Sequence, residues 1–278
     1  MSVDVVLAQP TRSIFWFRMK TCYTSLLTCA LIGVSTAAVR TEAQEQERGP
    51  YLRLGAGVQW PETSALEDQN CSSKKPPALF GCELGNDGRR LGAYGGFEQT
   101  PVLDAAFGYR WAPWLRTEAL LNWSPQLSLS STSNFLSGGS NQPVSASGNA
   151  FAGFAVLYVD GPELATIRPF IGAGLGAART SLSDVTYRFP AISGDAVTVS
   201  QGGSSASFAY LLTAGVSIPV SERIDLDLAY RWTDLGTVKT NSGSARIVRP
   251  AGQFNLDIAG TQIDLKSQSL LASLRFRF

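Results

Sequence analysis

Apolar and polar residues alternate along the last segment of the chain, residues 261–278. Successive side chains of an extended strand point to opposite faces, so this period of two predicts a β-strand with one apolar and one polar face. Two kinds of strand fit the pattern: a membrane strand with lipid on its apolar side, and a half-buried edge strand of a soluble sandwich. The apolar positions are Leu270, Ala272, Leu274, Phe276 and Phe278, and the polar positions are Ser269, Ser273, Arg275 and Arg277.

Seven further segments show strand-like patterns, which makes eight predicted strands in all. Most of them have the length of about 9–11 residues that a tilted strand needs to cross a bilayer. The predicted strands are residues 51–60, 102–112, 115–123, 150–159, 168–179, 207–220, 224–233 and 261–278.

The connections between these strands alternate between long and short. Short turns are expected at Pro113 and Trp114, around Gly161 and Pro162, and at residues 221–223. Long connections are expected before residue 102, where residues 91–97 could extend the second strand, and at residues 125–148, 181–206 and 235–260. This rhythm favours a membrane barrel with tight periplasmic turns and long extracellular loops, because a soluble sandwich has no reason to keep it.

The aromatic residues suggest two belts at the ends of the predicted strands. Membrane barrels carry such belts where the outer surface meets each lipid–water interface. We therefore expect an aromatic girdle formed by Trp60, Trp123 and Trp232 at the outer level, and by Trp111 and Trp114 at the periplasmic level. Tyr51, Tyr158, Phe170 and Phe278 are expected to join the periplasmic belt.

A soluble eight-stranded barrel of the lipocalin type also fits the strand count, but with an apolar lumen and a polar exterior. The charged face of the predicted strands carries both signs, and near residue 51 it also holds Gly55 and Gly57, which suit a crowded interior. We therefore place the charges inside, either as a structural network of ion pairs or as the lining of a small-solute channel. The predicted lumen charges are Asp104, Arg110, Arg116, Glu118, Asp225, Asp227, Arg231, Arg275 and Arg277.

Composition agrees with a membrane barrel and excludes several kinds of chemistry. Only 16% of the residues are charged, against about 25% in typical soluble domains. Lysine plus arginine number 23 against 22 acidic residues, so nothing points to nucleic acid. The chain has no histidine, which removes Ser–His–Asp and Cys–His catalysis and the commonest metal ligand. We expect no cofactor, no metal site and no enzymatic activity.

The N-terminal part of the chain has the pattern of an export signal. Lys20 precedes a short apolar stretch that ends on small residues, with cleavage plausible after Ala38 or Ala43. We expect residues 1–43 to be an N-terminal extension plus signal peptide, with Met19 as a possible start, and residues 44–278 to be the barrel domain. In an exported chain, Cys71 and Cys82 are candidates for a disulfide.

Four segments resemble a known family. They are YLRLGAGVQW at 51–60, RPFIGAGLGAA at 168–178, AYLLTAGVSIPVSERIDLDLAYRWTDLG at 209–236 and SLRFRF at 273–278. Together they are similar to the opacity-protein-like surface antigens, also described as OmpA-like or OmpX-like outer-membrane β-barrels. The resemblance implies an adhesin, surface antigen or structural barrel, and less often a narrow pore. It also implies that the C-terminal Phe276 and Phe278 form part of the signal read by the barrel-assembly machinery.

The expected protein is thus all-β: an eight-stranded antiparallel up-and-down transmembrane β-barrel of the bacterial outer membrane. Its expected partners are outer-membrane lipid, the barrel-assembly machinery and host or environmental surface ligands that contact the loops. The leading functional prediction is a non-enzymatic surface protein, and the alternative is a narrow porin-like channel through the charged lumen.

Overall fold

The computed structural model describes residues 48–85, 87–134, 142–190 and 196–278. The expected N-terminal extension and signal peptide, residues 1–43, lie outside these ranges. Among the described residues, no helix is both long and apolar enough to cross a membrane.

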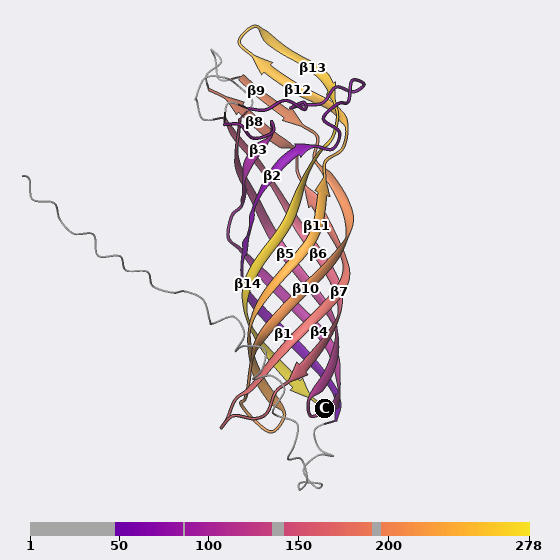
Figure 1. Ribbon diagram of the computed structural model, residues 1–278, viewed down its shortest axis with the longest axis vertical. Coiled ribbons are helices and arrows are strands. Elements are labelled where there is room, and N and C mark those ends of the chain that lie inside the picture. Colours follow the sequence, from indigo (N-terminus) through magenta and orange to yellow (C-terminus); the bar gives the residue numbers. More distant parts are fainter. Residues whose placement is uncertain (1–47, 86, 135–141, 191–195) are drawn as a thin grey trace, which may run out of the picture. The chain divides into compact units, whose positions relative to one another are not determined.

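Eight strands form a closed ring, which confirms the predicted fold class. Each strand is antiparallel to the next, and β1 pairs with β14 from Tyr51↔Arg277 to Pro61↔Ser267, so the ring has no free edge. Figure 1 shows these strands winding around the barrel. In ring order they are β1 (Gly49–Pro61), β4 (Thr100–Ala112), β5 (Leu115–Ser133), β6 (Pro143–Asp160), β7 (Arg168–Leu182), β10 (Gly203–Pro219), β11 (Ile224–Lys239) and β14 (Thr261–Arg277).

The two ends of the barrel differ. The short connections 113–114, 161–167 and 220–223 lie at the end that also carries Gly49 and Phe278, which we call the turn end. The other end, which we call the ribbon end, carries the remaining strands of the described residues, all of them short (Figure 1). They are β2 (Thr63–Asp68), β3 (Ala93–Phe97), β8 (Val185–Phe189), β9 (Ala196–Ser200), β12 (Gly243–Arg249) and β13 (Gly252–Ile258).

The predicted long connections contain more strand than the sequence indicated, and the one expected at 125–148 is shorter. β5 continues to Ser133 and β6 begins at Pro143, so most of the expected loop 125–148 is strand. The stretches 181–206 and 235–260 likewise contain short strands. Residues 93–97 do extend the line of β4, because β3 pairs with the same strand β5 on the ribbon-end side of the first residues of β4.

Two bulges reverse which face of a strand points inward. In β5 the buried positions are even-numbered up to Ser124, and they become odd-numbered from Leu127 onward. The pairing register with β6 shifts between Ser124 and Leu127 at the same place. An extra residue in one strand changes the parity of every side chain that follows it. In β11, a register shift between Asp234 and Thr237 surrounds Gly236, whose φ is +76°.

Beyond these bulges the interior changes from charged to apolar. Leu127 and Leu129 of β5 now point inward, while Ser128 and Ser130 face outward. Inward-facing side chains from six other strands join this cluster, so the ribbon end has the polarity of a soluble barrel. They include Leu66, Val144, Leu182, Val185, Tyr187, Val238, Ile263 and Leu265.

The barrel wall between the bulges and the turn end has the opposite polarity. Large apolar side chains such as Phe107, Leu175 and Leu274 are exposed on its outer face, while charged residues are buried inside. Such an exposed apolar surface needs a lipid or another apolar partner, because soluble monomers rarely expose large contiguous apolar patches.

Candidate functional sites in the lumen and at the ribbon end

The structure places the predicted lumen charges in one connected interior cluster. Eight of the nine are buried, and Arg277 is half-buried at the turn end. Two partners that the sequence reading missed complete the cluster. Arg53 shares the inward face of β1 with Gly55 and Gly57, which is a signal that could have found it. Asp160 is the last residue of β6, one position beyond the predicted strand.

Two carboxylates bind the central arginines. Glu118 of β5 accepts from Arg53 of β1, with Nη2 at 2.7 Å from Oε2, and from the hydroxyl of Tyr51 at 3.0 Å. Asp104 of β4 accepts from Arg231 of β11 at 2.6 Å and from the amide of Asn122 at 2.8 Å. Charge-assisted bonds of this length are among the stronger ones in proteins.

A further arginine crosses the lumen. Arg116 of β5 is fully buried, and its Nη1 lies 3.7 Å from Oδ2 of Asp227 on β11. In ring order, β5 and β11 stand on opposite sides of the barrel. Arg116 also donates from Nε to Asp160 at 2.9 Å, and its guanidinium lies 4.4 Å from the ring centroid of Tyr158. At this level the lumen is filled by side chains, as expected for eight strands.

Three aromatic residues expected in the periplasmic girdle are instead inside the barrel. Tyr51, Tyr158 and Phe170 are all buried, so this part of the girdle prediction was wrong. Each is paired across strands with an inward-facing glycine, in the pairs Tyr51↔Gly108, Tyr158↔Gly172 and Phe170↔Gly215. A Cβ on any of these glycines would come within 2.7 Å of the facing ring, so the missing side chain provides the room for it.

The tryptophans are distributed over the outer face. Trp60, Trp111, Trp114 and Trp123 are exposed, whereas Trp232 is half-buried and donates its indole N–H to Glu62 at 3.0 Å. Trp123 and Trp232 were expected at strand ends, but both lie within strands that continue toward the ribbon end. Their role as an interface girdle stays a prediction, as does the assembly role of Phe276 and Phe278. Phe278 is exposed at the turn end.

The first long connection is folded around a carboxylate and a disulfide. Cys71 and Cys82 are bonded, as the sequence predicted. Both oxygens of Asp68 accept backbone N–H groups, from Leu79 and Phe80 at 2.9 Å and from Gly81 at 2.8 Å. The ring of Phe80 contacts Tyr187 of β8 edge-on, and burial raises the pKa of the Tyr187 phenol.

Replacing Cys71 with serine is expected to loosen this connection without unfolding the barrel. The bond closes a short loop at the ribbon end, away from the lumen pairs, and a loop of this size is worth about 2–3 kcal/mol by chain entropy. Limited proteolysis of the folded protein should show faster cleavage between β2 and β3, with the barrel fragment intact. Unchanged cleavage would mean that Asp68 alone holds the connection.

Within the described ranges, no group of three or more cysteine or acidic side chains is placed to hold a metal ion. The charged lumen, the apolar outer wall and the closed eight-stranded ring together define a transmembrane outer-membrane β-barrel. The family model of the outer membrane protein beta-barrel domain matches residues 27–278, and the chain belongs to this family. Membership places it among proteins of the bacterial outer membrane.

Curated relatives are similar over only part of their length. A Rickettsia bellii protein named "Putative adhesin" is 35% identical over 122 residues, which are 43% of this chain and 49% of the relative. Among solved structures, OprG of Pseudomonas aeruginosa has a TM-score of 0.48 at 14% identity, covering 83% of this chain and 96% of that one. Neisserial surface protein A has a TM-score of 0.41 at 16% identity, covering 83% and 97%.

Proposed function

We propose that this protein is a non-enzymatic surface protein whose ribbon end binds an external ligand. In barrels of this class the short turns face the periplasm and the long connections face outward. The ribbon end would then be the extracellular surface. The name of the Rickettsia bellii relative supports an adhesive role.

The observation that carries this proposal is the hairpin formed by β12 and β13. β13 is the last strand of the sheet and pairs only with β12, so its outer edge has no strand partner among the described residues. Six of its seven residues are exposed, and they include Phe254 and Leu256. An exposed edge with large apolar side chains is a surface that proteins normally protect unless another molecule covers it.

The closed lumen supports the surface role over the alternative of a narrow channel. Conduction would require the contact between Arg116 and Asp227, and the pairs around Asp104, to separate. Planar-bilayer recording would test this alternative, because a conducting lumen gives steady unitary currents that change when Arg116 or Arg231 is replaced.

Replacing both Phe254 and Leu256 with serine is expected to weaken adhesion about ten- to thirtyfold. Both side chains are about half exposed, and burying the rest of two such groups is worth roughly 2 kcal/mol. The measurement is attachment of bacteria that display the protein to cultured epithelial cells.

Leu84→Ser provides the matched control, because Leu84 is an exposed apolar residue of the first connection, outside the hairpin. Attachment of this variant should equal that of the native protein. The proposal fails if the displayed native protein adds no attachment over bacteria without it, or if the hairpin variant attaches as well as the native protein.

A further inference from the structure

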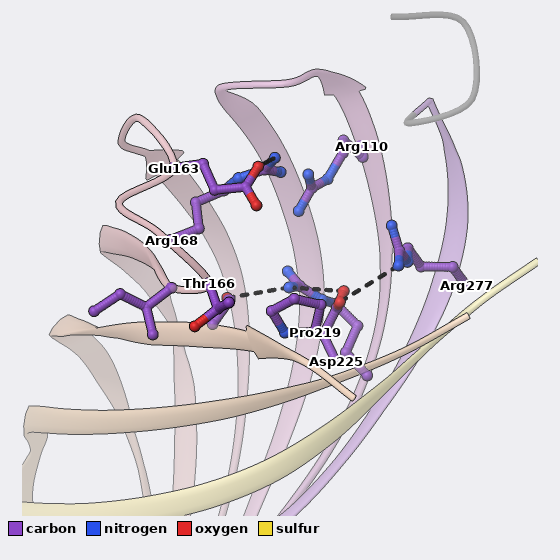
Figure 2. A pocket seen from close by; sticks show the side chains of 10 residues that line it. Arg110, Glu163, Thr166, Arg168, Pro219, Asp225 and Arg277 are labelled. Carbon is purple, nitrogen blue, oxygen red and sulfur yellow. Dashed lines mark hydrogen bonds and ion pairs between the residues drawn. The ribbon is translucent and has the colours of Figure 1, made fainter. Parts of the chain in front are cut away.

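A charged hollow at the turn end of the barrel has its ion pairs closed within the chain. Its volume is about 120 Å³, and Figure 2 shows the side chains around it, with Asp225 joined to Arg277. The hollow offers no free charge to a ligand, whereas the ribbon end offers an unpaired strand edge. Each arginine in the lining lies within 3.6 Å of a carboxylate: Arg110 of Asp160, Arg168 of Glu163, and Arg275 and Arg277 of Asp225.

The outer edge of β13 stands out among the strands of the ribbon end. Within the described ranges, β2, β3, β8, β9 and β12 each pair on both sides. β13 pairs only with β12, and no other backbone hydrogen bond among the described residues involves residues 253–257. All five of these residues are exposed. The edge therefore presents a row of main-chain donors and acceptors to a further strand.

This edge lacks the usual protection against pairing. Natural sheets protect a free edge with lysine, proline, a bulge or a very short strand. The sequence of β13, GQFNLDI, has no lysine or proline, and its only charged residue is Asp257. Its pairing with β12 runs from Gly243↔Ile258 to Arg249↔Gly252 without a register shift, so no bulge interrupts it. An unprotected edge of this length favours the addition of another strand.

The sequence of β13 is complementary to itself when two copies run antiparallel. Asn255 is the middle residue of the strand, so a twofold axis through it pairs the largest number of residues. Residues directly opposite each other in an antiparallel pair share a face of the sheet. This register sets Phe254 of each copy against Leu256 of the other, which makes two aromatic–aliphatic pairs. It also sets Asp257 against Gln253, so the two negative charges do not meet.

We propose that the ribbon end binds a second copy of this chain through antiparallel pairing of the two β13 edges, centred on Asn255. The pairing joins the two β12–β13 hairpins into one continuous sheet. Because edge pairing extends a sheet sideways, the faces of both hairpins stay accessible to the external ligand of the proposed function. The inference goes beyond that function and does not depend on it.

The contact is small for a protein interface. One pair of seven-residue strands covers far less than the roughly 1,600 Å² of a standard interface. The dimer is therefore expected where the membrane concentrates the copies, and covalent capture is the suitable measurement.

The test is disulfide formation in the outer membranes of bacteria that express the full chain, with copper phenanthroline as the oxidant. Opposite Cα atoms in an antiparallel pair lie about 4.5–5.5 Å apart, within the roughly 4.4–6.8 Å that a disulfide spans. Asn255→Cys should therefore give about ten times more linked dimer than the native protein. The native protein, treated in the same way, reports any linkage through its own cysteines.

Gln253→Cys is the matched control, because this exposed residue lies on the same face of β13 as Asn255. In the proposed register the two copies of residue 253 are four residues apart, about 13 Å along the strand, which is too far for a disulfide. Gln253→Cys and Asp257→Cys should each give no dimer alone. Expressed together they should link, since the register places them opposite each other.

This mixed pair keeps the test decisive if Asn255→Cys does not fold. Boiled and unboiled gel samples, which separate folded from unfolded barrel, establish folding for each variant. Two different epitope tags identify a linked product as a dimer of this chain. Linkage of the mixed pair within one cell supports the proposal with both copies in one membrane. Linkage only after mixing two cell populations that each display one variant supports it with the copies on neighbouring cells.

Three results would overturn the proposal: no dimer from folded Asn255→Cys above the native background, equal linkage by Gln253→Cys alone, or a linked product that carries only one tag. Host cells are absent from this assay. Its failure would therefore leave the proposed adhesive function to be decided by the attachment measurement alone.

Discussion

Replacing Glu118 with alanine is expected to destabilise the folded barrel by about 3–5 kcal/mol, the usual cost of removing one partner from a buried ion pair. The change leaves Arg53 without its shortest contact and removes the acceptor of the Tyr51 hydroxyl. Arg53 keeps the longer approach to Asp104 at 3.6 Å and its hydrogen bonds to the hydroxyls of Ser273 at 3.2 Å and Tyr158 at 3.4 Å, none of which replaces the lost bidentate carboxylate. Urea unfolding followed by tryptophan fluorescence in detergent micelles measures the free energy of unfolding.

Two further variants make this experiment specific. Glu222→Ala removes an exposed carboxylate at the turn end and should change the free energy of unfolding by less than about 0.5 kcal/mol. The double variant Arg53→Met with Glu118→Leu should recover much of the loss, because it replaces both buried charges with apolar groups of similar volume. A loss below 1 kcal/mol for Glu118→Ala would indicate a hydrated lumen, and the channel alternative would gain support.

Gly108→Ala is expected to destabilise the barrel by about 1–3 kcal/mol, the usual cost of overpacking a filled interior. A Cβ at this position would lie 2.3 Å from Cζ of Tyr51. The ring cannot move away cheaply, since Tyr51 is buried and its hydroxyl donates to Glu118. The same urea titration measures the effect.

Gly153→Ala is the control for that substitution. Its Cβ would find its nearest neighbour at 3.8 Å, an ordinary van der Waals distance, so a glycine in the same kind of strand gains a methyl group without a clash. We expect this variant to unfold at or slightly above the native urea concentration, because alanine restricts the unfolded chain. Equal destabilisation by both variants would show that backbone effects dominate over the ring contact.

The eight strands could be predicted because alternation reports directly on a wall with lipid on one side. The same signal failed near Pro125, where the bulge in β5 reverses the parity and the inward residues change from polar to leucine. When the alternation of apolar and polar residues shifts by one position, the sequence pattern looks like the end of a strand. The sequence therefore predicts a loop where the strand in fact continues into the ribbon end.

The sequence predicted most of the charged residues that line the lumen, but it did not predict which of them pair with one another. Parity alone places Tyr51 on the same inward face as Arg53, and Gly108 and Gly172 mark where inward rings could fit. We instead assigned these rings to the periplasmic girdle because they lie near predicted strand ends. Contacts across the ring, such as the one between Arg116 and Asp227, depend on how strands distant in sequence are staggered when the barrel closes, which no local pattern records.

The shared ion pairs of the lumen also limit how this sequence can change over time. Arg53 contacts both Glu118 and Asp104, and Asp104 in turn contacts Arg231, so a change of sign at any one position leaves a buried charge without its counterpart. Accepted changes inside the barrel are expected to arise as compensated exchanges between residues on different strands, such as Arg53 with Glu118, 65 positions apart, or Asp104 with Arg231, 127 positions apart. Outward-facing positions such as Leu175 can drift singly among apolar residues, so interior and exterior of one strand evolve under different rules.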